Sequence, residues 1–188
     1  YQSQIGVLRW AVELGRIDIA TEVSMLAAYS VAPRHGHLAA VLHVFAYLNN
    51  HGRSRLVLDP TYLPEIVCPE YDWTDFYGEV KEPIPHDCPK PRGNAVQMTC
   101  FVDSDHAGDL VTRRSRTGVV ILVNRAPIVW YTKKQGSIET SSFGSEFSAM
   151  KTGVELVIGL RYKLRMMGIP LDGPTRVLAD NMSVVNNT

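Results

Sequence analysis

The spacing of apolar residues separates a helical first part of the chain from a β-rich last part. Over residues 1–58, apolar side chains recur at intervals of three and four, the period of an amphipathic helix. Three stretches share this spacing: residues 5–14, 18–30 and 36–48. Asp18 is placed to cap the second helix, and residues 55–58 form a short candidate strand.

From residue 97 onward the pattern changes to short apolar runs separated by turns. Strands are expected at residues 97–102, 118–123, 128–132 and 175–179, and a long helix at residues 143–167. The first three strands are close enough in sequence to form an antiparallel meander. The expected fold class is therefore α/β, a mixed sheet with flanking helices, preceded by a small helical segment.

The intervening residues 59–95 differ from both parts because they hold most of the prolines. Seven of the eleven prolines lie here: Pro60, Pro64, Pro69, Pro83, Pro85, Pro89 and Pro91. Acidic and aromatic residues accompany them, and we expect an irregular connection that packs partly onto a neighbouring domain. The predicted organisation is a helical segment at 1–58, a linker at 59–95 and an α/β domain at 96–188.

Acidic residues stand at the ends of the predicted elements. Asp103, Asp105 and Asp109 follow an apolar run, and the strand is expected to end where these acids begin. Glu146 falls in the first turns of the long helix, and Asp180 follows the last strand. Crowded carboxylates favour a bound cation, and oxygen ligands suit Mg²⁺ or Mn²⁺. The alternative for the first group is a polar turn whose Asp and Gly serve the backbone.

Charge is balanced over the whole chain but not locally. Nineteen basic residues match nineteen acidic ones, so composition alone indicates no nucleic-acid partner. Residues 111–137, however, contain no acid and carry a strip of basic side chains: Arg113, Arg114, Arg116, Arg125, Lys133 and Lys134. Beside a carboxylate cluster, such a strip favours binding of a nucleic-acid backbone, and the alternative is a solvated basic hairpin.

Five blocks of the sequence, in order, resemble the ribonuclease H domain of copia-type retrotransposon polyproteins. They are VDSDHAGD (102–109), TRRSRTG (112–118), APIVWYTKKQ (126–135), SSFGSEFSAM (141–150) and ADNMSVV (179–185). The resemblance implies a ribonuclease H-like fold. It also implies that Asp103, Glu146 and Asp180 are the catalytic carboxylates and bind two Mg²⁺ or Mn²⁺ ions, with Asp105 the less favoured occupant of the first position.

Some positions depart from the pattern of this family. His106, Phe143 and Gly144 stand where the family commonly has Trp, Thr and Glu. The family also carries a fourth acidic residue after the helix that starts at Asn181, and we expect it beyond Thr188, which would leave the active site incomplete.

The first part of the chain resembles, more loosely, the region between polymerase and ribonuclease H in the same polyproteins. The likeness lies in YQSQIGVLRWAVELGRIDIATEVSMLAAY (1–29) and HLAAVLHVFAYL (37–48). By analogy this part is the thumb or connection of a reverse transcriptase. The catalytic acids of the polymerase are expected upstream, so this chain is not expected to synthesise DNA.

These observations predict metal-dependent endonucleolytic hydrolysis of the RNA strand of RNA:DNA hybrids, within a retrotransposon reverse transcriptase. Arg113, Arg114, Arg116, Lys133 and Lys134 are expected to bind phosphates, and Ser104 and Asn181 to contact the 2′-hydroxyl-bearing strand. Two alternatives are a non-catalytic connection-like module with the same fold and a phosphatase that uses Asp103 and Asp105.

The expected partners are the hybrid and the remaining reverse transcriptase domains of the same polyprotein. No membrane partner is expected, because no apolar run is long enough to span a bilayer. Three cysteines form no disulfide framework, which is typical of a reducing compartment. The expected location is intracellular, in a cytoplasmic retroelement particle or in the nucleus.

Overall fold

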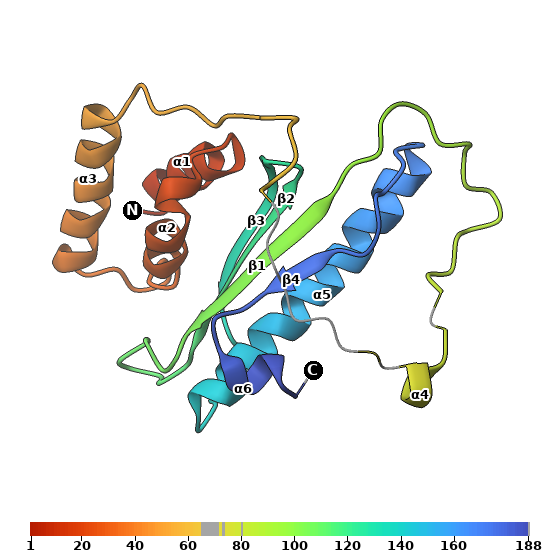
Figure 1. The fold of residues 1–188 in the computed structure, drawn as a ribbon. Coiled ribbons are helices and arrows are strands. Elements are labelled where there is room, and N and C mark those ends of the chain that lie inside the picture. The colour runs from red at the N-terminus through yellow and green to blue at the C-terminus, as the bar shows by residue number, and fades with distance from the viewer. Residues whose placement is uncertain (65–71, 73, 80, 188) are drawn as a thin grey trace.

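A computed structural model of the chain describes residues 1–64, 72, 74–79 and 81–187 (Figure 1). A helical unit comes first, an extended connection follows, and a sheet with one long helix completes the chain. The helices are α1 (Gln2–Glu13), η1 (Ile17–Ile19, a 3₁₀ turn), α2 (Ala20–Ala27), α3 (His35–Asn50), α4 (Thr74–Tyr77), α5 (Ser142–Met166) and α6 (Met182–Val185). The strands are β1 (Met98–Asp105), β2 (Arg116–Val123), β3 (Ala126–Lys134) and β4 (Arg176–Leu178).

The sheet has four strands in the order β3-β2-β1-β4. β1, β2 and β3 form the predicted antiparallel meander, and β4 pairs with β1 in parallel. A two-residue turn joins β2 to β3, and its first residue, Asn124, has a positive φ of 55°, which Asn tolerates better than most residues. The fold is therefore the expected mixed α/β arrangement, consistent with a ribonuclease H-like fold.

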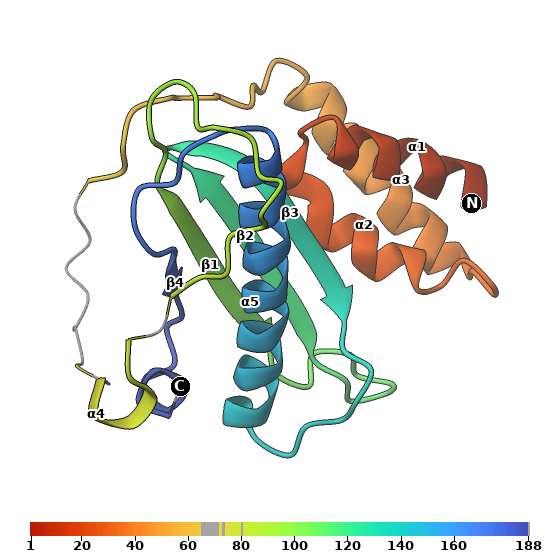
Figure 2. The same ribbon diagram turned by 90° about the vertical axis from the view of Figure 1, so that its right-hand side faces the viewer.

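Helix α5 covers one face of the sheet (Figure 2). Its buried residues recur at helical intervals and pack against alternate residues of β1 and β2, among them Cys100, Val102 and Val119. Gly153 marks the closest approach, because a Cβ added there would lie 2.4 Å from a methyl group of Val102. The face of α5 that carries Glu146 is thus held tightly on the sheet.

The helical unit of α1, η1, α2 and α3 lies on the other side of the sheet, against β3 (Figures 1 and 2). It has its own apolar cluster, which includes Ile5, Leu8 and Val41. Two hydrogen bonds join it to β3: Trp130 Nε1 donates to the Val12 carbonyl (3.1 Å), and Ser24 Oγ donates to the Thr132 carbonyl (3.1 Å). This helical unit therefore forms a wall beside the open face of the sheet.

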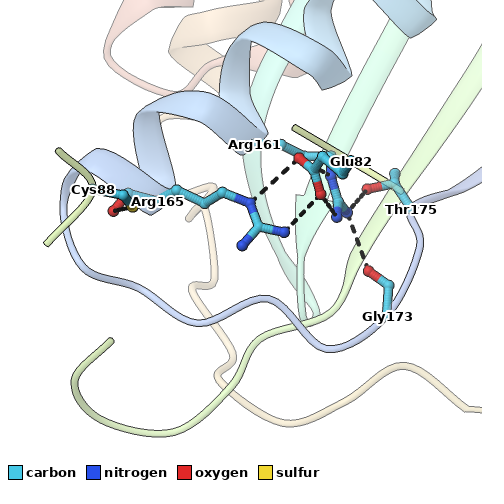
Figure 3. A network of polar contacts seen from close by, with 6 residues as sticks. All are labelled: Glu82, Cys88, Arg161, Arg165, Gly173 and Thr175. Carbon is cyan, nitrogen blue, oxygen red and sulfur yellow. Dashed lines mark hydrogen bonds and ion pairs between the residues drawn. The ribbon is translucent and has the colours of Figure 1, made fainter. Parts of the chain in front are cut away.

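The proline-rich connection returns along α5 and is held there by an ionic network (Figure 3). The carboxylate of Glu82 accepts hydrogen bonds from the guanidinium groups of Arg161 and Arg165, with shortest distances of 2.6 Å for each. Arg161 also donates to Thr175 Oγ1 and to the Gly173 carbonyl, close to the start of β4. The connection thus packs onto the α/β part, as expected, although the division of the chain at residues 58 and 95 stays a prediction.

Three expectations about local structure were wrong. β1 does not end before the acids but runs through Asp103 to Asp105, because the backbone of β2 pairs with it as far as Arg116. Residues 55–58 form no strand. Asp18 does not cap a helix but lies inside η1, where it accepts hydrogen bonds from Arg16 and Tyr47.

No helix in the described ranges combines the length and the apolar character that a membrane crossing requires.

Candidate metal centre

Three acidic side chains converge at one end of the sheet: Asp103 of β1, Glu146 of α5 and Asp180, which follows β4. One carboxylate oxygen of each lies within 4.8 Å of those of the other two. Strand register explains two of them, because Phe101 pairs with Leu178 and each aspartate stands two residues further along the chain from this pair. In a parallel pair, residues at the same level point to the same face, so Asp103 and Asp180 meet there.

Glu146 reaches the two aspartates from the second turn of α5. Ser141 caps the helix by accepting a hydrogen bond at Oγ from the Gly144 backbone amide (3.2 Å). The buried side chain of Gln135 then fixes the helix start to the sheet, because its Nε2 donates to the Ser145 carbonyl (2.9 Å) and to Thr117 Oγ1 (3.1 Å). No pattern in the sequence singled out Gln135 for this role.

The three carboxylates differ in exposure, since Glu146 is 7% exposed while Asp103 and Asp180 are open to solvent. Burial is the main cause that raises the pKa of Glu146, and the nearby charges of Asp103 and Asp180 raise it further. Its proximity to the Ser104 hydroxyl and backbone acts in the opposite direction. Glu146 therefore carries its negative charge at a cost that a positive ion would remove.

The donor set at this site fits a hard divalent cation. All three side chains offer oxygen, which Mg²⁺ and Mn²⁺ prefer. Among the described residues, buried Glu146 Oε2 makes no hydrogen bond, and the same is true of the neighbouring Ser104 Oγ. A buried carboxylate oxygen without a partner is costly, and a cation held between Asp103, Glu146 and Asp180 would satisfy it.

Asp105 does not join this cluster. It shares a face with Asp103, because the two residues are two positions apart on β1, but its carboxylate lies over Gly108. A Cβ at Gly108 would fall 1.7 Å from Asp105 Oδ2, so glycine is the residue that leaves room for this arrangement. Asp105 therefore directs its carboxylate to the loop after β1 and stands outside the cluster of Asp103, Glu146 and Asp180.

A cleft of about 590 Å³ runs from Asp103 and Asp180 along the open face of the sheet. Helical residues Ile17, Ala20 and Thr21 line one of its walls. Its floor is largely apolar and includes residues of all four strands: Phe101, Val120, Trp130 and Leu178. The acids therefore stand at the end of a groove between the helical unit and the sheet rather than on a flat surface.

The expected nucleic-acid contacts are placed unequally. Arg116 is half-buried, and its Nη1 donates to Ser24 Oγ of α2 (2.6 Å). Lys134 Nζ donates to Asp109 Oδ2 (2.9 Å). Arg113 and Lys133 are exposed and Arg114 is half-buried. Within the described ranges, the side chains of these last three make no hydrogen bond or ion pair, so they remain available for phosphates.

Of the two polar candidates near the acids, Asn181 has a structural role. Asn181 Oδ1 accepts hydrogen bonds from the backbone amides of Ser183 (3.0 Å) and Val184 (3.3 Å), which caps α6 where a helix start was predicted. Ser104 Oγ is buried beside Glu146.

Comparison with known proteins found distant relatives. The chain is 23% identical over 165 residues to secreted RxLR effector protein 161 of Plasmopara viticola, covering 88% of this chain and 94% of that protein. It is 27% identical over 158 residues to a transposon Ty5-1 protein of Saccharomyces cerevisiae, covering 83% of this chain and 41% of that protein. It is 23% identical over 185 residues to the retrovirus-related Pol polyprotein from transposon RE1 of Arabidopsis thaliana, covering 97% of this chain and 10% of the polyprotein.

No family model matches the chain, and no solved structure matches it. In length, the chain spans less than half of the Ty5-1 protein and about a tenth of the RE1 polyprotein. Further matches include the Pol polyproteins from transposons RE2 of Arabidopsis thaliana and TNT 1-94 of Nicotiana tabacum, at 28% and 25% identity. The relatives of this chain therefore include retrotransposon Pol polyproteins, at low identity.

Proposed function

We propose that this chain is a ribonuclease H module related to retroelement polyproteins, and that it hydrolyses the RNA strand of RNA:DNA hybrids. The observation that carries the proposal is the convergence of Asp103, Glu146 and Asp180 within 4.8 Å, with one buried carboxylate oxygen of Glu146 left without a partner. Relatives named as Pol polyproteins support the retroelement context.

The three carboxylates would hold Mg²⁺ or Mn²⁺. When bound, two such ions activate water for attack on a phosphodiester and stabilise the leaving oxygen. Two side chains near the site that could act as covalent nucleophiles are poorly suited to that role: burial raises the pKa of the Cys100 thiol to about 11, and Ser145, whose Oγ lies 3.4 Å from His106 Nδ1, is fully buried. Direct attack by water is therefore the reaction that this site supports.

The hybrid fits the remaining features of the site. Exposed Arg113 lies in the loop that joins β1 to β2. Exposed Lys133 of β3 pairs with Thr117 of β2, which in turn pairs with Ser104 next to Asp103. Contacts to phosphates and to 2′-hydroxyl groups recognise a hybrid by backbone shape, without regard to sequence. The expected partner is thus an RNA:DNA duplex of any sequence.

A second candidate is a non-catalytic module with the same fold. One observation favours it, because a relative matched along 94% of its own length is named as a secreted effector rather than a polyprotein. This candidate predicts an intact fold without metal-dependent turnover.

Cleavage of a labelled duplex separates the two candidates. The protein is incubated with an RNA:DNA hybrid, duplex RNA, single-stranded RNA and duplex DNA of one sequence, each with Mg²⁺ or Mn²⁺. We expect cleavage of the RNA strand of the hybrid alone, a loss of at least about 100-fold in Asp103→Asn, and retention in the matched control Asp105→Asn. Absence of hybrid cleavage by folded wild-type protein in both metals would overturn the enzyme proposal in favour of the non-catalytic module.

A further inference from the structure

The loop between β1 and β2 carries two of the basic residues and is organised by one acidic side chain. Asp109 Oδ1 accepts hydrogen bonds from the backbone amides of Val111 (3.0 Å) and Thr112 (2.9 Å). Its Oδ2 accepts one from Lys134 Nζ of β3 (2.9 Å). A single carboxylate thus joins the turn of the loop to the sheet.

Backbone hydrogen bonds of Asp109 also hold the two arginines of the loop, Arg113 and Arg114. The Arg113 amide donates to the Asp109 carbonyl (2.6 Å), and the Asp109 amide donates to the Arg114 carbonyl (3.2 Å). Arg113 has a positive φ of 56°, a conformation that a non-glycine residue adopts only where its surroundings hold it. The direction in which Arg113 and Arg114 project therefore depends on the turn that Asp109 holds closed.

The ion pair between Lys134 and Asp109 is partly buried. The side chains of Lys134 and Asp109 are 27% and 15% exposed, so neither is a freely solvated charge. The lysine holds the pKa of Asp109 well below its usual range, together with the backbone amides of the turn. A lysine that is paired in this way is poorly available to a phosphate, whereas the exposed side chain of neighbouring Lys133 is available.

We propose that Asp109 is a positioning residue that holds Arg113 and Arg114 ready for a nucleic-acid backbone, and that Lys134 supports Asp109 instead of binding phosphate. This inference rests on the proposed function, since it specifies how the same protein holds its hybrid. The predicted change in hybrid affinity is opposite to the one that net charge predicts. Removing the acidic Asp109 beside a basic surface would weaken the binding of a polyanion, although electrostatics alone would strengthen it.

The test measures how hybrid affinity depends on salt. Binding of a fluorescent RNA:DNA hybrid is followed by anisotropy in EDTA, so that the hybrid is not cleaved, at several salt concentrations. The slope of log affinity against log salt falls by about 0.9 for each phosphate contact that is lost. Asp109→Ala combined with Lys134→Ala leaves the net charge unchanged, and we expect it to lower the slope by about 1 to 2.

Two further variants make the result specific. Lys151→Ala with Glu155→Ala removes an exposed ion pair of α5, also without change in net charge, and should leave the slope unchanged. Asp109→Asn with Lys134→Ala keeps an oxygen acceptor for the turn amides and should recover most of the lost slope. Thermal unfolding of each variant verifies that the fold is intact.

The outcomes separate this inference from the proposed function. Wild-type protein that binds no hybrid in a salt-dependent manner overturns the proposed function. Wild-type binding with a slope that falls in Lys133→Ala, but not in the Asp109 and Lys134 double variant, overturns the positioning role alone. A slope in Asp109→Asn with Lys134→Ala that stays as low as in the double alanine variant would show that the lost contact is that of Lys134 with phosphate, and would overturn its assignment as a support for Asp109.

Discussion

The distance between Glu146 and Asp103 depends on how closely α5 approaches β1, and Gly153 sets that approach. It lies two turns after Glu146 on the same buried face of the helix. A Cβ at this position would meet Val102 Cγ1 at 2.4 Å and Cys100 Sγ at 3.3 Å. Replacing Gly153 with Ala therefore forces the helix away from the strand that carries Asp103.

Two opposing effects decide the size of the change in stability. Overpacking a core costs typically about 1–3 kcal/mol. The exchange of Gly for Ala within a helix gains about 0.5–1 kcal/mol. Gly153→Ala should therefore lower the free energy of unfolding by about 1 kcal/mol net, and the packing cost itself is roughly 2 kcal/mol.

Gly159 provides a matched control on the same helix. Nothing lies within 4 Å of a Cβ added there, so Gly159→Ala keeps the gain in helix propensity without any overlap. Chemical denaturation of the two variants compares them directly, and their difference isolates the packing cost. A difference of about 2 kcal/mol corresponds to roughly 4–8 °C in the midpoint of thermal unfolding.

The same pair of variants connects packing to the site. Because the shift at residue 153 displaces the segment that bears Glu146, Gly153→Ala should also weaken Mn²⁺ binding, whereas Gly159→Ala should not. Equal stability of the two variants, with unchanged metal affinity, would refute the reasoning that α5 and β1 are in close contact here.

Three further predictions concern other parts of the structure. Hydrogen bonds from two arginines of α5 lower the pKa of Glu82 from 4.5 to about 2, and Glu82→Gln should therefore lower the free energy of unfolding at neutral pH by roughly 1 kcal/mol, a figure reduced because the side chain is about a third exposed. Urea unfolding should show this difference from wild type shrinking as the pH falls from 4.5 towards 2. Cys100, buried and with its pKa raised to about 11, should resist alkylation at pH 8 in native protein while half-buried Cys88 reacts faster, as peptide mapping can verify. Ser24→Ala should cost about 1–2 kcal/mol, because it leaves the half-buried guanidinium of Arg116 without its acceptor.

Sequence patterns predicted the elements well where side-chain periodicity decides them. The three antiparallel strands, the long helix and the helix start at Asn181 were all expected and are present. The acids of the cluster were predictable because each stands near an end of such an element. Their convergence is confirmed by the structure, while their catalytic role stays a prediction.

The remaining features depend on partners that are distant in sequence. The low strand propensity of aspartate led to the prediction that β1 ends before Asp103. In the structure, backbone pairing with β2 extends β1 to Asp105, which lies opposite Arg116. Arg116 bonds to a serine 92 positions away, and Lys134 to an aspartate 25 positions away, so a count of basic residues cannot show that both are engaged. A run of basic residues in the sequence indicates a basic surface. Only the fold shows which of these residues are available to a ligand and which are paired within the protein.

The central claim is that Asp103, Glu146 and Asp180 form one site for a divalent cation. Titration of the folded protein with Mn²⁺, followed by electron paramagnetic resonance of the free ion, tests it without any requirement for turnover. The account predicts saturable binding to wild-type protein, loss of that binding in Asp103→Asn, and its retention in Asp105→Asn. Equal binding by all three proteins, or none by wild type, would contradict it.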